Sequence, residues 1–231
     1  MTATSALALT AAEAPIDAST ALSRAYLEFI KAKIIVLPPL GVPVAAGAIH
    51  PVLKPHQAAI VRWAVEGGRR AIFAAFGLGK SLIQLETMRQ LGLQLGGRQL
   101  IVVPLTVVTE FERDAQMLGM APRFVRRSSE VAGDGLYLTN YESVRDSKLD
   151  LTLFNAASLD EASCLRGFGG TKTFREFMRL FDGMQYKFVA TATPSPNEYV
   201  ELLAYAAFLE VMDVGQAKTR FFKRNSEEAD D

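Results

Sequence analysis

A chain of 231 residues, of which 49% are hydrophobic, is long enough for one domain with a substantial core. Its 25 basic and 25 acidic residues give a net charge of zero, which argues against a uniformly basic nucleic-acid surface but leaves a local one open. One cysteine excludes an internal disulfide framework and fits the cytoplasm, two histidines are too few for a metal site built mainly from histidine, and no apolar run is long enough to span a membrane.

The N-terminal quarter of the chain differs in composition from the rest. Residues 1–20 are rich in Ala, Thr and Ser and lack a basic leader, which predicts a disordered or weakly helical tail rather than a secretion signal. Residues 21–52 should hold a helix, over 21–33, followed by a connector that its prolines keep extended.

From residue 53 to 224 the pattern alternates between strands and helices, and an acidic tail follows at 225–231. Such alternation predicts an α/β fold in which a parallel sheet is covered by helices on both faces. We expect strands at 71–76, 99–103, 123–126, 135–139, 152–159 and 186–191, and helices at 56–66, 81–92, 106–118, 171–181 and 196–212.

Gln57 lies at the start of the first of these helices. Its amide offers one donor group and one acceptor group, which is the pair that an adenine edge needs. A glutamine at this place is, taken alone, more typical of an ordinary surface position.

The segment Gly77-Leu78-Gly79-Lys80-Ser81 stands between an apolar strand and a helix. The two glycines let the backbone turn tightly, so that N–H groups can face a phosphate near the start of the helix. Lys80 would then reach the outer phosphates, and the Ser81 hydroxyl would bind magnesium. The general phosphate-loop pattern has a glycine six residues before the lysine, where this chain has alanine. The alternative is a glycine-rich turn with a chance lysine.

Asp160 and Glu161 directly follow the strand expected at 152–159. In a nucleotide site, Asp160 would hold magnesium through water, and Glu161 would orient or deprotonate the attacking water. The alternative is a solvated acidic turn.

Thr191 and Thr193 end the strand expected at 186–191. Their hydroxyls can hydrogen-bond the acidic pair and so relay the state of a nucleotide. The phosphate loop, the acidic pair and these threonines all follow strands, and the carboxyl ends of parallel strands form the edge where ligands bind.

Together, and in this order, these elements resemble the first RecA-like domain of a superfamily-two helicase of the Swi/Snf-like branch. More closely still, the chain resembles helicases of phages and integrated prophages. The likeness covers about residues 50–224. Phe76 to Ser81 resembles the Gly-Leu-Gly-Lys loop of that branch, and Leu53 to Gln57 its adenine-contacting motif. Asp160 to Ser163 resembles the DEAH-type box, with Ser163 in place of the histidine. The resemblance implies ATP and Mg²⁺ as ligands and DNA as a partner.

Two further segments resemble motifs that contact the nucleic-acid backbone in this family. Val102 to Leu105 resembles the first of them, and Leu138 to Glu142 resembles the next one along the chain. The resemblance therefore implies Pro104, Thr139 and Asn140 as candidate DNA contacts.

The resemblance implies an ATP-binding motor domain that couples hydrolysis to DNA translocation or remodelling when paired with a second RecA-like domain. In the family that second domain supplies an arginine to the γ-phosphate, and we find no such domain after Met212, so we expect the chain alone to be weakly active. One alternative is a truncated nucleotide- or DNA-binding module without turnover. The other is a small-molecule P-loop kinase, against which the Thr191 motif and Gln57 argue.

Overall fold

The computed structural model describes residues 38–165, 172–195 and 199–221. The chain divides into two units, residues 1–37 and 38–231, and the first unit lies wholly outside the described residues. The same holds for the expected helix at 21–33 and for the expected tail at 225–231. Within the described ranges, no helix combines the length and the apolar character needed to cross a membrane.

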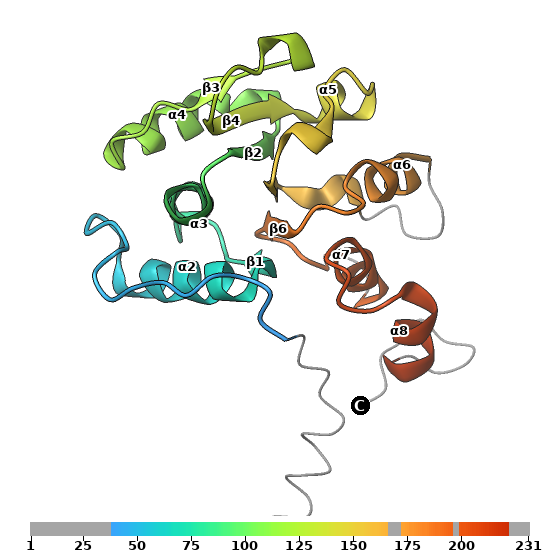
Figure 1. Ribbon diagram of the computed structural model, residues 1–231. Coiled ribbons are helices and arrows are strands. Elements are labelled where there is room, and N and C mark those ends of the chain that lie inside the picture. The colour runs from blue at the N-terminus through green and yellow to red at the C-terminus, as the bar shows by residue number, and fades with distance from the viewer. Residues whose placement is uncertain (1–37, 166–171, 196–198, 222–231) are drawn as a thin grey trace, which may run out of the picture. The chain divides into compact units, whose positions relative to one another are not determined.

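A six-stranded sheet forms the centre of the fold, and every strand pair in it is parallel (Figure 1). The strand order is β1-β6-β5-β2-β4-β3, which confirms the predicted parallel sheet. The strands are β1 (Arg69–Phe73), β2 (Arg98–Val103), β3 (Arg123–Phe124), β4 (Gly135–Asn140), β5 (Ala156–Asp160) and β6 (Tyr186–Thr191).

Helices cover both faces of the sheet, as expected. One face packs against Val61, Ile83 and Phe111 from three helices, and the other against Phe177 and Phe208. Figure 1 shows α2 and α3 on one side of the strands and α6 and α7 on the other. The α-helices are α2 (Pro55–Gly67), α3 (Lys80–Leu95), α4 (Val108–Met117), α5 (Tyr141–Arg145), α6 (Lys172–Leu180), α7 (Leu202–Phe208) and α8 (Val214–Phe221). The 3₁₀ helices are η1 (Leu105–Val107), η2 (Ser128–Glu130), η3 (Leu151–Leu153), η4 (Ala162–Leu165) and η5 (Tyr199–Glu201).

The register of the central strands brings three loops together at one edge of the sheet. Phe73, the last residue of β1, lies beside Thr191, the last residue of β6. Asp160, the last residue of β5, lies beside Ala190. The segments that follow β1, β5 and β6 therefore leave the sheet side by side, at the edge where open α/β sheets bind ligands.

The strand expected at 71–76 is observed at Arg69–Phe73, and two further expected elements differ more. The strand expected at 152–159 begins only at Ala156, because the Asp150 side chain accepts the Thr152 N–H and starts the 3₁₀ helix η3 instead. The described part of the helix expected at 196–212 consists of η5 and α7 and ends at Phe208, and Glu210 then takes a positive φ of 54°. The separate helix α8 was not expected.

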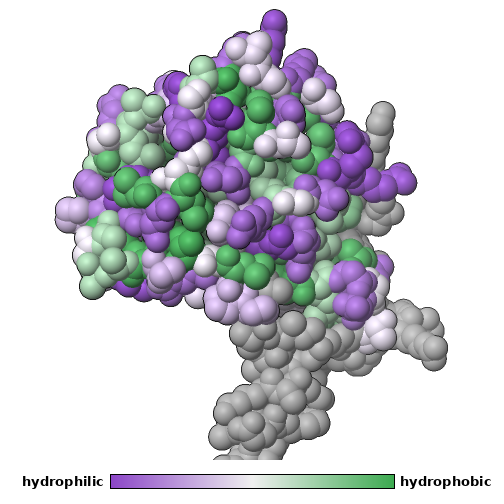
Figure 2. Space-filling model, viewed as in Figure 1, coloured by the Kyte–Doolittle hydropathy of each residue, from purple (hydrophilic) through white to green (hydrophobic). Residues whose placement is uncertain are grey.

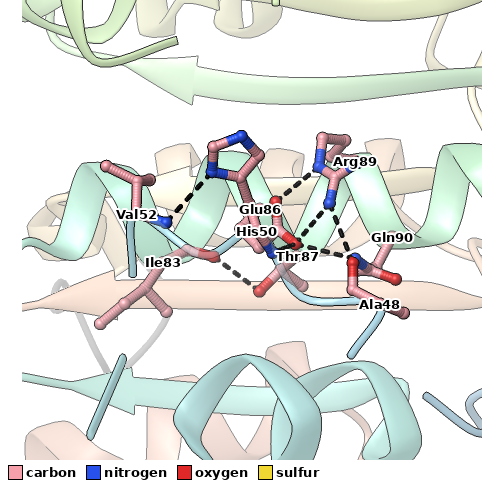
Figure 3. A network of polar contacts seen from close by, with 8 residues as sticks. All are labelled: Ala48, His50, Val52, Ile83, Glu86, Thr87, Arg89 and Gln90. Atoms are coloured by element: carbon pink, nitrogen blue, oxygen red, sulfur yellow. Dashed lines mark hydrogen bonds and ion pairs between the residues drawn. The ribbon is translucent and has the colours of Figure 1, made fainter. Parts of the chain in front are cut away.

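The segment before α2 packs against α2 and α3. The N–H groups of residues 40–42 donate to the carbonyls of residues 65–67 at the end of α2. Further along, the buried carboxylate of Glu86 in α3 accepts the His50 N–H, while Arg89 and Gln90 reach from α3 to the Ala48 carbonyl (Figure 3). The proline-rich segment is therefore held along the helix that follows the phosphate loop.

The surface seen in Figure 2 carries hydrophilic and apolar residues interspersed. Several large apolar side chains are nevertheless exposed in the segments that follow the strands, where Phe76 is 78% and Leu105 is 52% exposed. The loops at this edge are thus less covered than the sheet beneath them.

Candidate functional site

The loop between β1 and α3 turns at two glycines. Gly77 has φ of 81° and Gly79 has φ of 76°, which is the left-handed region that glycine adopts without a steric penalty. A Cβ atom at Gly79 would collide with Nε2 of Gln57, so a side chain here would displace the Gln57 amide. The helix begins at Lys80, and its first N–H groups have no helical partner, so the loop and the helix start together suit an anion.

Gln57 lies beside this loop with 4% of its surface exposed. Its Nε2 donates to the Leu78 carbonyl at 3.0 Å, and its Oε1 accepts the Lys54 N–H at 2.8 Å. Both amide atoms thus bind the protein backbone, which leaves one N–H and one lone pair for another partner. The observed role of Gln57 is to hold the phosphate loop against the start of α2, and the adenine contact stays a prediction.

Lys80 lies at the first position of α3, with its Nζ 4.9 Å from the centre of the Phe76 ring. This distance allows a cation–π interaction, which is weak at an exposed site. The ammonium is therefore at the loop, where a negatively charged ligand would compete favourably with the ring.

Asp160 ends β5 and is only 8% exposed. Its Oδ1 accepts a hydrogen bond from Nε2 of Gln84 at 2.7 Å, and Oε1 of Gln84 accepts one from the Ser158 hydroxyl at 2.6 Å. Burial raises the pKa of Asp160 to about 6; the Gln84 hydrogen bond and the Lys80 charge oppose that rise, and the Glu161 charge adds to it. The side chain is held in place, but its negative charge is incompletely compensated.

Glu161 follows directly and adopts a positive φ of 50°, which is uncommon for a residue with a side chain. Its Oε1 accepts a hydrogen bond from the Thr191 hydroxyl at 2.8 Å, and the same hydroxyl oxygen accepts the Thr193 N–H at 3.1 Å. The expected contact between Thr191 and the acidic pair is thus present. Thr193 takes part through its backbone, and a role in relaying nucleotide state stays a prediction.

Ser81 points toward α4, where its hydroxyl donates to Oδ2 of Asp114. Asp114 is 8% exposed and was not among the predicted site residues, and neither was Gln84. A weak signal was available for Asp114, a polar residue beside Phe111 and Ala115 on an otherwise apolar helix face, but not for Gln84, whose helix buries other polar side chains as well.

The three candidate DNA contacts have different surroundings. Thr139 is fully buried and its hydroxyl donates to the Val125 carbonyl, while Asn140 is 7% exposed and its Nδ2 donates to Glu142. These two side chains are turned into the protein, contrary to what a direct DNA contact requires. Pro104 is partly exposed at the start of η1 and stays a candidate.

The oxygen donors at the site fit a magnesium ion that is held jointly with phosphates. Within the described ranges, no cluster of three or more His, Cys, Asp or Glu side chains could hold a metal without further ligands. Mg²⁺ usually takes one or two carboxylates together with substrate phosphates and water, so the hydroxyl of Ser81 and the carboxylate of Asp160 suit it.

Comparison of the sequence with models of protein families gives no match, and no curated protein matches it in sequence. Among solved structures, the fold is similar to the SWI2/SNF2 ATPase core of Sulfolobus solfataricus in complex with dsDNA, with a TM-score of 0.62 and 20% identity over 81% of this chain and 41% of that one. It is also similar to the UvsW helicase of bacteriophage T4, with a TM-score of 0.53 and 14% identity over 81% of this chain and 64% of that one. The chain therefore shares the α/β fold of these two proteins. The chain spans less than half of the first of these proteins and less than two thirds of the second.

Proposed function

We propose that the chain is the ATP-binding motor domain of a DNA helicase or translocase, which couples ATP hydrolysis to movement on DNA when paired with a second RecA-like domain. The observation that carries the proposal is the convergence of the phosphate loop, the acidic pair and Thr191 at the ends of the adjacent strands β1, β5 and β6. The similar fold of two helicase ATPase cores supports the same function.

Binding would rest on the loop and on Lys80. The N–H groups at the start of α3 and the Lys80 ammonium present positive charge to phosphate oxygens. Ser81 and Asp160 would hold Mg²⁺, which when bound neutralises charge on the phosphates. Gln57 keeps the loop in its turned conformation through the Leu78 carbonyl.

Hydrolysis would rest on Glu161. Its carboxylate is directed by the Thr191 hydroxyl, and a carboxylate in a fixed direction can orient a water molecule and accept its proton. Because Thr191 ends β6 and Glu161 follows β5, a shift between these two strands would change the position of the base. This arrangement favours a motor over a small-molecule kinase.

A titration with Mg-ATP tests the nucleotide half of the proposal. Lys80→Ala removes the charge that faces the phosphates, which should weaken binding by about 1.5–3 kcal/mol. Lys148→Ala is the matched control, because Lys148 is an exposed lysine that pairs only with Asp146 among the contacts described for it, and it should leave the affinity unchanged. Equal affinity of the wild type and Lys80→Ala would refute the assignment of the loop.

Fluorescence anisotropy of a labelled DNA duplex, measured with and without Mg-ATP at several salt concentrations, tests the DNA half. We expect binding that weakens with added salt, because phosphate contacts release counterions. A lack of DNA binding at low salt would restrict the chain to nucleotide binding.

A further inference from the structure

The hydrogen bond between Ser81 and Asp114 joins the helix of the phosphate loop to α4, which comes from a different part of the sequence. The two oxygens of Asp114 face different surroundings. Oδ2 accepts the Ser81 hydroxyl, whereas Oδ1 lies 3.2 Å from Nη2 of Arg113, whose side chain is 70% exposed. Asp114 therefore has one carboxylate oxygen bound to Ser81 and an outward oxygen beside the exposed side chain of Arg113.

The hydrogen bond fixes what the Ser81 hydroxyl can do. A serine hydroxyl has a single hydrogen and two lone pairs, so a hydrogen given to Asp114 leaves the lone pairs of Ser81 to a cation. A hydrogen bond to an ionised carboxylate is stronger than one to a neutral group, and it draws the hydroxyl oxygen toward negative charge. Carboxylates behind the direct ligands of metal sites orient those ligands in this way.

We propose that Asp114 is a positioning residue for magnesium. By accepting the hydrogen of the Ser81 hydroxyl, Asp114 directs the lone pairs of that oxygen toward the ion that accompanies ATP. The inference rests on the proposed nucleotide function. It differs from a purely structural tie between α3 and α4, because a tie would stabilise the fold without changing how strongly magnesium increases ATP affinity.

The quantity that separates these two roles is the ratio of ATP affinity with Mg²⁺ to ATP affinity in EDTA, measured by calorimetric titration. Asp114→Asn keeps the shape of the side chain but removes its charge and introduces an N–H donor, so the Ser81 hydroxyl is no longer held in one orientation. We expect the ratio to fall about tenfold, the lower end of the effect of losing such a partner, while the affinity in EDTA changes less than twofold. Asp114→Ala, which removes the acceptor outright, should give the same loss.

A double-mutant cycle with Ser81→Ala tests whether Asp114 acts through Ser81. In the Ser81→Ala background, Asp114→Asn should have no further effect on the ratio, because the hydroxyl that it positions is gone. Arg113→Ala is the control on the same helix and should leave the ratio within twofold of the wild type, since Arg113 contacts only the outward oxygen. Thermal unfolding without nucleotide establishes that each variant is folded.

The possible outcomes are distinct. A fall in affinity that is equal with and without Mg²⁺, or an equal loss in the wild-type and Ser81→Ala backgrounds, would overturn the role of Asp114 and leave the proposed function standing. An absence of ATP binding by the wild-type chain would instead overturn the proposed function itself, and this inference with it.

Discussion

Two buried carboxylates lie at the helix α3: Glu86 belongs to it, and Asp160 accepts a hydrogen bond from its Gln84 side chain. The polar groups around the two carboxylates have opposite effects on their charge. Glu86 accepts hydrogen bonds from Arg89 at 2.6 and 2.8 Å, from Gln90 at 2.7 Å and from the His50 N–H at 3.0 Å (Figure 3). Burial raises the pKa of Glu86, but these donors outweigh it and leave the pKa below its usual value. Asp160 accepts a hydrogen bond from Gln84 and has a second carboxylate as its neighbour, and its pKa is raised to about 6.

The difference suits Glu86 to a role in the fold and Asp160 to its proposed role at a nucleotide site. Around Glu86 the protein supplies a cation and several donors, so no further positive charge is required. Around Asp160 it supplies only the Gln84 amide and the charge of Lys80, so under the proposed function the remaining negative charge is available to a metal ion. Strongly perturbed carboxylates at the end of a strand are typical of functional sites for this reason.

The largest effect is expected at the structural carboxylate. Glu86→Ala leaves Arg89, Gln90 and the His50 N–H without their acceptor and should cost about 3–5 kcal/mol of unfolding free energy, measured by urea denaturation. The matched control is Glu176→Ala, since Glu176 forms an ion pair with Arg179 at the same i,i+3 spacing on an exposed face, where such a pair is worth about 0.5 kcal/mol. Similar losses of unfolding free energy in the two variants would show that the hydrogen bonds of Glu86 do not stabilise the fold more than an exposed ion pair does.

A substitution at the site carboxylate should act in the opposite direction. Asp160→Asn removes an undercompensated charge, while its carbonyl oxygen can still accept the Gln84 hydrogen bond. A rise of the pKa from 3.8 to about 6 corresponds to roughly 3 kcal/mol of destabilisation at neutral pH, so the variant should gain about 2–3 kcal/mol without nucleotide. It should also lose the increase in ATP affinity caused by Mg²⁺. A variant less stable than the wild type at pH 8 would contradict the comparison.

The positions of the glycine loop and of the acidic pair at strand ends could be predicted from the sequence, because each directly follows an apolar strand. The roles of Gln84 and Asp114 could not, since these roles depend on contacts with residues 76 and 33 positions away. Ser158 illustrates the same limit. In the sequence it is only a polar residue within the expected strand, and in the structure its hydroxyl binds the amide that holds Asp160.

The candidate DNA contacts were chosen from a motif resemblance, which does not tell whether a side chain is exposed. Thr139 was selected by its place in a motif, but the parallel pairing of β4 between β2 and β3 buries it, and its hydroxyl binds the chain beyond β3. Which face of a strand a residue occupies depends on the register of the whole sheet, and this register was not available from the sequence.

The pH dependence of stability should differ in sign between the two carboxylates. Because the folded-state pKa of Glu86 is lowered, its stabilisation is complete above the unfolded pKa and is lost as the pH falls through the folded value. Because the folded-state pKa of Asp160 is raised, the folded protein holds its proton more tightly. The resulting loss of stability is absent below the ordinary pKa of 3.8 and complete above about 6.

Denaturation curves from pH 4 to 8 measure this contrast as differences from the wild type. The advantage of Asp160→Asn should grow over this range by about 2 kcal/mol and level off above pH 6. The deficit of Glu86→Gln should instead be nearly constant over the same range and shrink only at the acid end. Parallel curves for the two variants would remove the basis for treating the carboxylates as different.

The smallest effect on stability is expected for two buried hydroxyls, one near Asp160 and one near Glu86. The Ser158 hydroxyl donates to Oε1 of Gln84, and that of Thr87 donates to the Ile83 carbonyl within α3. Ser158→Ala leaves a buried amide oxygen without its donor and should cost about 1–2 kcal/mol, whereas Thr87→Val should cost less than about 1 kcal/mol, because the Ile83 carbonyl keeps its helical hydrogen bond.

The second measurement on these two variants is their affinity for Mg-ATP. Ser158→Ala frees Gln84 to turn, so Asp160 loses part of its orientation and Mg-ATP should bind about threefold more weakly, a change equal to roughly 0.65 kcal/mol. Thr87→Val touches neither side chain and should leave the affinity unchanged. If both substitutions left Mg-ATP binding unchanged, the chain from Ser158 through Gln84 to Asp160 would be part of the core packing, and the orientation of Asp160 would have to come from the backbone of β5 alone.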